Sequence, residues 1–229
     1  MKIIFNGKNN VIHYIKIKRQ SNKTIDHIYI YHSDNFLVED FLVGINIIEI
    51  INNTIIEISY LNMILTKASI LTKSKTYTKL EGFIREEDGY LYDQDIIDTL
   101  YDWDNGKIID WRSKSERFKA SYINACSLGN YRQFKFINSE NKMLDGNKVN
   151  SKNELYIMLG ELFYGIGGFF GSGLDGLYDY LIDVSKNNSL NEMTLLIINK
   201  ENLILKLDED YYRAFVKILK NKKFNVIEK

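Results

Sequence analysis

Hydrophobic and polar residues alternate with two different periods along the chain, and the period changes near residue 140. Before that point, short apolar runs rich in Ile, Tyr, Phe and Thr lie between clusters of Asn, Asp, Gly and Ser, a pattern typical of strands and turns. We predict strands over six such runs: 11–17, 25–31, 55–60, 64–71, 76–85 and 107–111. Lys8-Asn9-Asn10 and Asp104-Asn105-Gly106 are predicted turns, the second of the hairpin type, and a helix is expected around 115–125. Residues 1–139 are therefore predicted to form a β-rich domain, whose role the pattern does not indicate.

Residues 140–229 combine the strand period with the helix period. Ser151 and Glu154 form a predicted capping box, in which the hydroxyl accepts a bond from the third amide and the carboxylate reaches back to the cap. The other predicted elements are a strand at 142–144, a turn at 145–147, helices at 155–162, 174–181 and 208–220, and strands at 194–198 and 224–227. This order indicates a small α/β domain with a short parallel sheet flanked by helices. The chain as a whole is thus predicted to be a two-domain protein of the α+β or α/β class.

Composition narrows the class of protein. The chain has 229 residues, of which 45% are hydrophobic and 26% charged, as in globular domains. Thirty basic residues balance thirty acidic ones, which argues against a general nucleic-acid binder, so we expect no direct contact with nucleic acid. Cys126 is the single cysteine, which rules out an internal disulfide and fits a reducing cytoplasm.

Two features of the sequence argue against a membrane protein. Residues 1–7 lack the basic, apolar and small-residue regions of a signal peptide. The most apolar stretch, 36–65, contains four acids, whereas a spanning helix needs about 20 mostly apolar residues. We expect a soluble cytoplasmic protein with no membrane partner.

A glycine-rich loop stands out between 165 and 176, where six of the fourteen glycines lie in the segment GIGGFFGSGLDG. A dinucleotide-binding loop must follow a strand and open a helix, whereas a helical run precedes this one. The segment also lacks the lysine of a phosphate-binding loop. We therefore predict no cofactor.

Two aspartates follow the loop at helical spacing. Asp175 and Asp179 are four residues apart, which puts them on one face of the predicted helix together with Tyr178. Leu174, Leu177 and Leu181 are predicted to take the opposite, buried face. Two carboxylates and a tyrosine beside a glycine loop would suit a cationic partner surface. The alternative is a solvated helix face, since the helix dipole by itself favours an acid in the first turn.

The segment LDGNKVNSKNELYIMLGELFYGIGGFFGSGLDGLYDYL, residues 144–181, resembles the barstar family of ribonuclease inhibitors. Members of that family have a strand ending in a DG-like turn, a capped helix, an aromatic-aromatic-glycine loop, and a helix carrying LDxLxDxL. The GxGGFFG variant of the loop is similar to that of longer bacterial members, which carry an added N-terminal region. The resemblance covers 140–229 and leaves the first 139 residues without a family.

The resemblance implies a function and a site. In that family the loop and the following helix plug the active site of a secreted nuclease, where carboxylates take the places of phosphates held by basic residues. The implied partner-binding residues are Phe169, Gly171, Ser172, Gly173, Asp175, Tyr178 and Asp179. The expectation is a non-enzymatic immunity protein that blocks a nuclease toxin, of the ribonuclease type, with a cationic active site. The alternative is a protein–protein interaction module on a barstar-like fold whose partner is not a nuclease.

The charge distribution supports an acidic binding face and also marks a departure from the family. From residue 145 to 210 there are eleven acids and five lysines, a local balance of −6. From 213 to 223 there are five bases and no acid, whereas the founding member carries further acids in its last helix. Ser172 and Gly173 replace the more usual polar pair before LD. These differences bear on which toxin is bound, and neither its identity nor an oligomeric state is predicted.

Eight acids and no base lie between residues 86 and 104. The segment misses the ligand register of a calcium loop, and we expect a solvated hairpin face. A second acidic surface against a cationic toxin is the alternative. An enzyme built on this stretch is not expected, because no nucleophile, base and orienting group occur together.

The remaining candidates for chemistry carry no pattern. His13, His27 and His32 lie in predicted strands without spaced cysteine or carboxylate partners, so no metal site is predicted. Cys126 lacks the signature of a nucleophile and is expected to be a small buried residue. Trp103 and Trp111 are expected to pack in the core or across strands.

Overall fold

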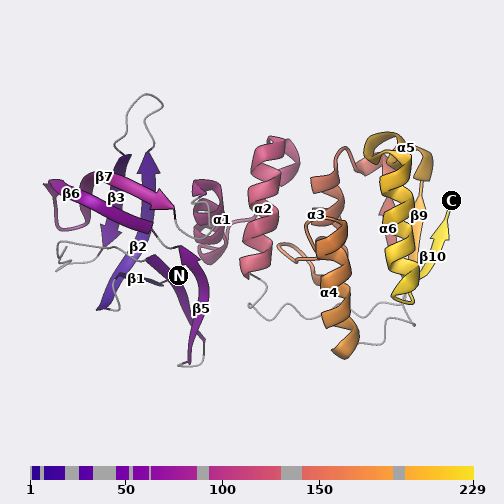
Figure 1. The fold of residues 1–229 in the computed structure, drawn as a ribbon, viewed down its shortest axis with the longest axis horizontal. Coiled ribbons are helices and arrows are strands. Elements are labelled where there is room, and N and C mark those ends of the chain that lie inside the picture. Colours follow the sequence, from indigo (N-terminus) through magenta and orange to yellow (C-terminus); the bar gives the residue numbers. More distant parts are fainter. Residues whose placement is uncertain are drawn as a thin grey trace. The chain divides into compact units, whose positions relative to one another are not determined.

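The computed structural model divides the chain into two compact units, Met1–Ile109 (unit 1) and Asp110–Lys229 (unit 2) (Figure 1). The residues that the structure describes are 2–5, 8–18, 26–32, 45–51, 54–61, 63–86, 93–129, 141–187 and 194–229. Unit 2 begins ahead of the change in hydrophobic period near residue 140, because helix α2 (Glu116–Gly129) packs on helix α3 (Lys152–Tyr164). A barstar-like domain bounded at 140 stays a prediction.

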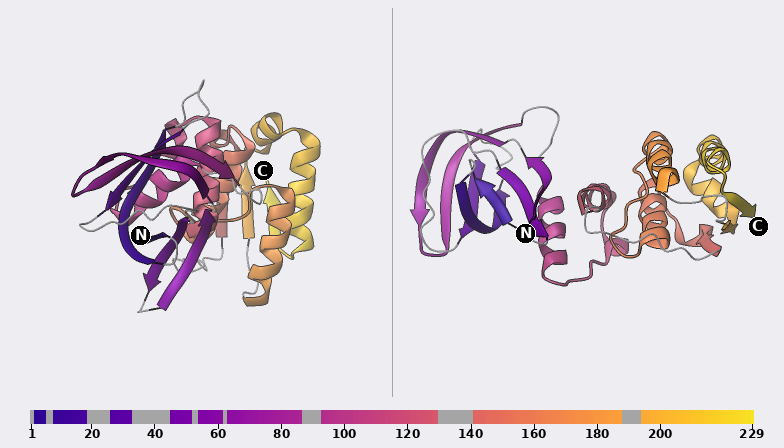
Figure 2. Two further views of the ribbon diagram at one scale, coloured as in Figure 1. Left: turned by 60° about the vertical axis from the view of Figure 1, so that its left-hand side comes forward. Right: turned by 90° about the horizontal axis from the view of Figure 1, so that it is seen from below.

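Within the described residues, unit 1 is an antiparallel sheet with the strand order β5-β4-β1-β2-β3-β7-β6. Its strands are β1 (Lys2–Phe5), β2 (Lys8–Lys18), β3 (Asp26–His32), β4 (Ile45–Ile51), β5 (Thr54–Leu61), β6 (Met63–Lys73) and β7 (Tyr77–Glu86). The sheet is strongly curved, as the right-hand view of Figure 2 shows. One helix, α1 (Gln94–Asp104), follows the last of these strands.

Five of the six predicted strands are confirmed, as β2, β3, β5, β6 and β7. The predicted turn at Lys8-Asn9-Asn10 is wrong, because these residues belong to β2 and Lys8 pairs with Phe5 of β1. Cross-strand pairing here overrides the turn preference of asparagine. The strands β1 and β4 were not predicted.

The predicted hairpin at Asp104-Asn105-Gly106 and the predicted strand at 107–111 are both wrong. The tripeptide ends α1: the Asn105 N–H donates to the Tyr101 carbonyl at 3.1 Å, and Gly106 follows with φ of +74°. Trp111 then begins a short 3-10 helix, η1 (Trp111–Ser113). A glycine with positive φ serves equally in a hairpin turn and at a helix C-terminus, so the local signature does not separate the two.

Unit 2 contains a parallel sheet of three strands in the order β10-β9-β8. Its described elements beyond η1, α2 and α3 are β8 (Asn141–Asp145), the 3-10 helix η3 (Gly146–Lys148), α4 (Leu174–Asn187), β9 (Thr194–Ile198), α5 (Lys200–Leu207), α6 (Glu209–Asn221) and β10 (Asn225–Glu228). Helices α3 and α4 connect β8 with β9, and α5 and α6 connect β9 with β10. The predicted mixed α/β class, with a short parallel C-terminal sheet and flanking helices, is confirmed. Helix α5 was not predicted; it has eight residues and no side-chain cap at Asn199.

One face of this sheet is buried against helices. Leu144, Leu195 and Ile197 point to that face and are 0% exposed. The apolar helix residues that are also 0% exposed are Leu155, Leu159, Phe163, Leu177, Leu181, Phe215 and Leu219. Burying each such side chain contributes about 1.5–3 kcal/mol, so this core is the main source of stability in unit 2.

The N-terminus of α3 differs in one detail from the predicted capping box. The Ser151 hydroxyl accepts from the Glu154 N–H at 3.3 Å, as predicted. The Glu154 carboxylate, however, accepts from the backbone N–H of Asn150 at 2.8 Å and from the Lys119 ammonium at 2.6 Å. Lys119 and Glu154 are both buried, and a buried pair of this kind is costly to break from one side. This ion pair ties α2 to α3.

Candidate functional site

Helix α4 presents a buried face and an open face, as its sequence predicts. Leu177 and Leu181 are 0% exposed, but Leu174, which was also predicted to be buried, is only half-buried at the start of the helix. Asp175, Tyr178 and Asp179 are exposed, Tyr178 by 44%. The first helical bond runs from the Leu177 N–H to the Gly173 carbonyl at 2.8 Å. The buried leucines therefore fix the orientation of the helix and hold the two carboxylates and the tyrosine outward.

The loop before α4 is held tightly by glycines that face the protein's own backbone. Gly171 has φ of +91°, and a Cβ built on it would lie 2.7 Å from the Leu177 nitrogen. A Cβ on Gly168 would lie 2.5 Å from the Gly160 carbonyl oxygen in α3. These glycines are thus explained by packing within unit 2. Gly173 differs, since a Cβ there would meet nothing within 4 Å.

The two phenylalanines of the loop have different roles. Phe170 is 0% exposed and its ring stacks on Phe163, with centroids 4.4 Å apart. Phe169 is half-buried and meets the ring of Tyr180 edge-on, with centroids 5.3 Å apart. Phe169 is therefore the loop aromatic that a partner can reach, and its orientation is set by Tyr180.

Lys222, at the end of α6, lies over the open face of α4. Its Nζ is 3.9 Å from the centroid of the Tyr178 ring, a close cation–π contact. The sequence places lysines in this last helix but does not indicate that one of them lies on Tyr178. The face that carries Asp175 and Asp179 thus already holds one cation of the chain itself.

The open face of α4 carries two carboxylates, those of Asp175 and Asp179. Among the described residues, neither Asp175 nor Asp179 makes a side-chain hydrogen bond or an ion pair. Burial, the bond to Tyr211 at 2.8 Å and, least of these, the charge of Asp175 raise the pKa of Tyr156 well above its usual range. The open face can therefore accept a cationic group without first breaking a carboxylate contact. Ser172 is exposed at its edge.

The acidic stretch 86–104 is not the solvated hairpin face that was expected. Its described second half forms α1, capped by the Asp93 side chain, which accepts from the Asp95 N–H at 2.9 Å. The prediction failed because acids at the start of a helix and acids on a hairpin look alike in composition. Glu87 and Asp88 lie outside the described residues.

Three other candidate residues, Cys126, Trp111 and His32, are buried. Cys126 is 2% exposed, as expected, and burial together with the nearby charge of Glu161 raises the pKa of its thiol. Trp111 is 1% exposed, in the core as expected, and donates to Glu161 at 2.7 Å. His32 is buried beside Thr78, whereas the side chains of His13 and His27 are not described.

The described ranges contain neither a cluster of metal-ligating side chains nor a helix that could span a membrane. No group of three or more His, Cys, Asp or Glu side chains in this part of the chain is placed to hold a metal ion. No helix in the same ranges is long and apolar enough to cross a membrane.

A pocket in unit 1 was missed by the sequence analysis. It is lined by Tyr14, Tyr31, Asp98, Tyr101 and Asp102. One sequence signal points to part of this pocket. Residues 98–102 have the pattern Asp-x-x-Tyr-Asp, which is also the pattern of the predicted binding face at 175–179. The two tyrosines from the sheet carry no such signal.

Comparisons with models of known protein families, with curated proteins and with solved structures find no match to this chain. The likeness to the barstar family therefore rests on the residues of 144–181 and on the order of elements around them.

Proposed function

We propose that this protein is a non-enzymatic inhibitor that binds a nuclease toxin, of the ribonuclease type, and occludes its active site with α4 and the preceding loop. Such an immunity protein would act in the cytoplasm of the cell that makes the toxin. Residues 140–229 would then form a barstar-like domain, and the β-rich region before residue 140 would be an addition to it.

The observation that carries the proposal is that two carboxylates on α4 form no hydrogen bond or ion pair with the described residues. Asp175 and Asp179 lie one helical turn apart on the face that also exposes Tyr178, and in the described structure neither has a partner. Ribonuclease active sites hold phosphates with Lys, Arg and His, so a rigid pair of carboxylates can take the places of phosphates.

Rigidity of the face supports the same role. The loop is pinned to α3 at Gly160 and Gly168 and to α4 at Gly171, and Leu177 and Leu181 anchor the helix in the core. A preorganised surface loses little conformational freedom on binding, which favours tight association. Phe169 and Tyr178 offer ring area beside the charges, as residues at the centre of an interface commonly do.

One observation favours the alternative, an interaction module on this fold whose partner is not a nuclease. The Lys222 ammonium sits 3.9 Å from the Tyr178 ring centroid and brings positive charge to the surface that a cationic active site would approach. A partner with its own acidic group beside an apolar patch would meet Lys222 and Tyr178 together.

The test is capture followed by inhibition. The tagged full chain would be used to capture partners from the source cell, in parallel with the Asp175→Ala/Asp179→Ala double variant. The single variant Asp210→Ala is the control, because it removes an acid from the exposed surface of α6. The proposal predicts a nuclease that is captured by the wild type and the control, is lost with the double variant, and is inhibited by the purified wild type.

Two results would count against it. A captured protein without nuclease activity, lost with the double variant, would support the interaction module. A nuclease captured equally by all three proteins would move the binding surface away from α4.

A further inference from the structure

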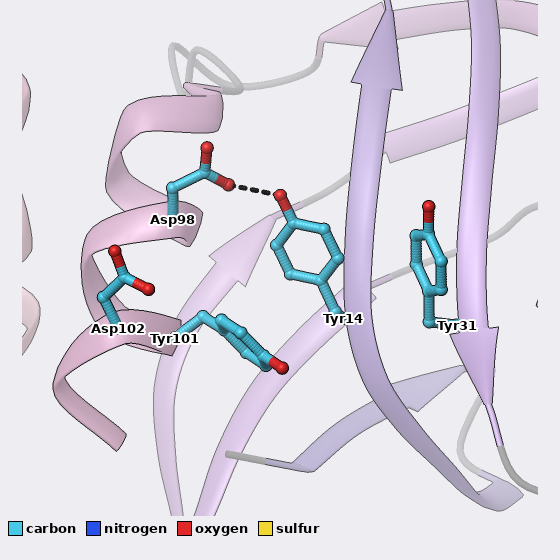
Figure 3. A pocket seen from close by; sticks show the side chains of 5 residues that line it. All are labelled: Tyr14, Tyr31, Asp98, Tyr101 and Asp102. Atoms are coloured by element: carbon cyan, nitrogen blue, oxygen red, sulfur yellow. Dashed lines mark hydrogen bonds between the residues drawn. The ribbon is translucent and has the colours of Figure 1, made fainter. Parts of the chain in front are cut away.

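Unit 1 contains a pocket of about 460 Å³ between α1 and the sheet (Figure 3). Asp98, Tyr101 and Asp102 line it from α1, Tyr14 from β2 and Tyr31 from β3. Pockets that bind small molecules have volumes of about 300–1,000 Å³, aromatic walls and a few fixed polar groups. This pocket has all three features.

The polar groups are held in place by hydrogen bonds. The Tyr14 hydroxyl donates to Oδ1 of Asp98 at 2.6 Å, and Figure 3 shows it pointing directly at that carboxylate. The Gln94 amide donates to the same oxygen at 2.6 Å. Over the described part of the chain, nothing donates a hydrogen bond to Oδ2 of Asp98. The carboxylate is therefore fixed in direction and keeps one oxygen for a ligand.

The pocket is electronegative. No basic side chain in the described ranges pairs with Asp98, and both donors to it are neutral. Burial, the bond to Asp98 and the charges of Asp98 and Asp102 raise the pKa of Tyr14, so its hydroxyl remains a neutral donor at physiological pH. Lys107 reaches Oδ1 of Asp102 at 2.8 Å, but its side chain is 63% exposed, and such surface pairs contribute little.

The tyrosine rings form a continuous wall and leave no space between them for a cation. The Tyr14 ring centroid lies 4.9 Å from that of Tyr101 and 5.6 Å from that of Tyr31. A spherical alkylammonium ion, which an aromatic cage surrounds, would meet this wall from one side only. A planar guanidinium can lay its flat face on a ring while its N–H edge donates to carboxylates.

We propose that this pocket binds a guanidinium group, with Asp98 and Asp102 accepting its hydrogen bonds and the Tyr14 and Tyr101 rings covering its face. The two carboxylates are one helical turn apart, within reach of the five donors of a single guanidinium. This site is in unit 1 and shares no residue with α4, so it stands or falls independently of the inhibitor proposal.

The first experiment compares ligands on the unaltered full chain by calorimetry and by NMR of labelled tyrosines. N-acetyl-arginine methylamide is the probe, and N-acetyl-citrulline methylamide is its neutral match in shape. We expect the arginine compound to bind in the millimolar range or tighter, about tenfold or more above citrulline, and to shift tyrosine ring signals. N-acetyl-lysine methylamide should bind more weakly than the arginine compound. Equal affinity for arginine and citrulline, or no binding of arginine, would overturn the proposal.

Variants then locate the site. Asp98→Asn keeps an oxygen for the Tyr14 hydroxyl but removes the charge, and should weaken arginine binding about tenfold. Asp110→Asn removes the same charge from an exposed residue whose side chain makes no cap bond, and should change nothing. Tyr101→Phe should bind like the wild type, whereas Tyr101→Leu should bind about two- to fivefold more weakly. Should Asp98→Asn unfold, the Tyr101 pair still decides, because equal binding by both variants would exclude the ring contact.

The source of the guanidinium is distinguished by a peptide arm. Gly-Gly-Arg-Gly-Gly is compared with the arginine derivative, each against its citrulline match. A peptide that binds markedly more tightly would assign the pocket to an arginine side chain of a polypeptide. Equal affinities would show that the pocket recognises the arginine side chain alone and gains nothing from a longer polypeptide.

Discussion

Helices α1 and α4 carry the same five-residue pattern in two different surroundings. The sequence DTLYD spans residues 98–102 and DGLYD spans 175–179. In each helix the leucine of the pattern is buried, Leu100 at 1% and Leu177 at 0% exposure. Helical geometry therefore places both aspartates and the tyrosine on the side away from the leucine in both helices.

The surroundings of the two patterns differ. In α1, the first aspartate is bound by Tyr14 and Gln94 at the wall of a pocket, and the pattern's tyrosine packs on Tyr14. In α4, both aspartates are free of such contacts in the described structure, and the tyrosine lies under Lys222. Our two proposals assign this pattern to a small cationic ligand in α1 and to a large cationic surface in α4, because other segments bring different groups to each helix.

The largest expected effect concerns the open pattern. Asp179→Ala should weaken binding of a captured nuclease by about 2–5 kcal/mol, the usual cost of truncating one partner of a buried charge pair at an interface. The free energy of unfolding should change by less than about 0.5 kcal/mol, because the carboxylate faces solvent in the free protein. Surface plasmon resonance and chemical denaturation measure the two quantities. A binding loss below about 0.5 kcal/mol would refute a charge anchor at Asp179.

The two leucines should respond alike, because both are buried. Leu100→Ala and Leu177→Ala should each lower the free energy of unfolding of the unit that contains them by about 2–5 kcal/mol, through lost burial and a residual cavity. Denaturant titration measures this loss. Leu205→Ala, at a residue that is 78% exposed, is the control and should stay within about 0.5 kcal/mol of the wild type. A small loss of unfolding free energy in only one of the two leucine variants would show that the two leucines do not contribute equally to stability.

The first aspartates should respond differently in stability. Asp98→Ala removes the acceptor of Tyr14 and Gln94 and should lower the free energy of unfolding by about 1.5–3 kcal/mol, as for hydrogen bonds to a charged group. Asp175→Ala loses only its favourable place at the helix N-terminus, about 0.3–1 kcal/mol. Thermal and denaturant unfolding of both variants tests the contrast. Equal losses would mean that the contacts around Asp98 add nothing.

The smallest expected effect concerns the cation on the open pattern. Lys222→Gln removes a cation–π contact of about 0.5–1 kcal/mol and opens the Tyr178 ring. Affinity for a cationic nuclease should therefore rise about two- to fivefold, measured by titration against the captured partner. Lys217→Gln, an exposed lysine of the same helix, controls for the change in net charge. A loss of affinity with Lys222→Gln alone would instead favour a partner that contacts this lysine.

Much of the local structure could be predicted from the sequence. The apolar run at 194–198 was predicted as a strand of a parallel sheet and is β9, and the Ser151 cap was placed correctly. The predictions were wrong or incomplete where the local sequence signal is ambiguous or absent. The tripeptide 104–106 was read as a hairpin because its residues suit two kinds of chain reversal, and only the α1 residues before it decide between them. Helix α5 is short and uncapped, so no local signal marks its start.

The amino-acid sequence is sufficient to predict which residues share a face, because backbone geometry fixes the spacing of side chains along a helix or strand. It therefore predicted that Asp175, Tyr178 and Asp179 lie together. The contacts of each side chain, in contrast, depend on the tertiary structure. Glu154 binds Lys119 of another helix, and Asp98 binds a tyrosine 84 positions away. Such contacts depend on how distant segments pack, and no local period along the chain encodes that packing.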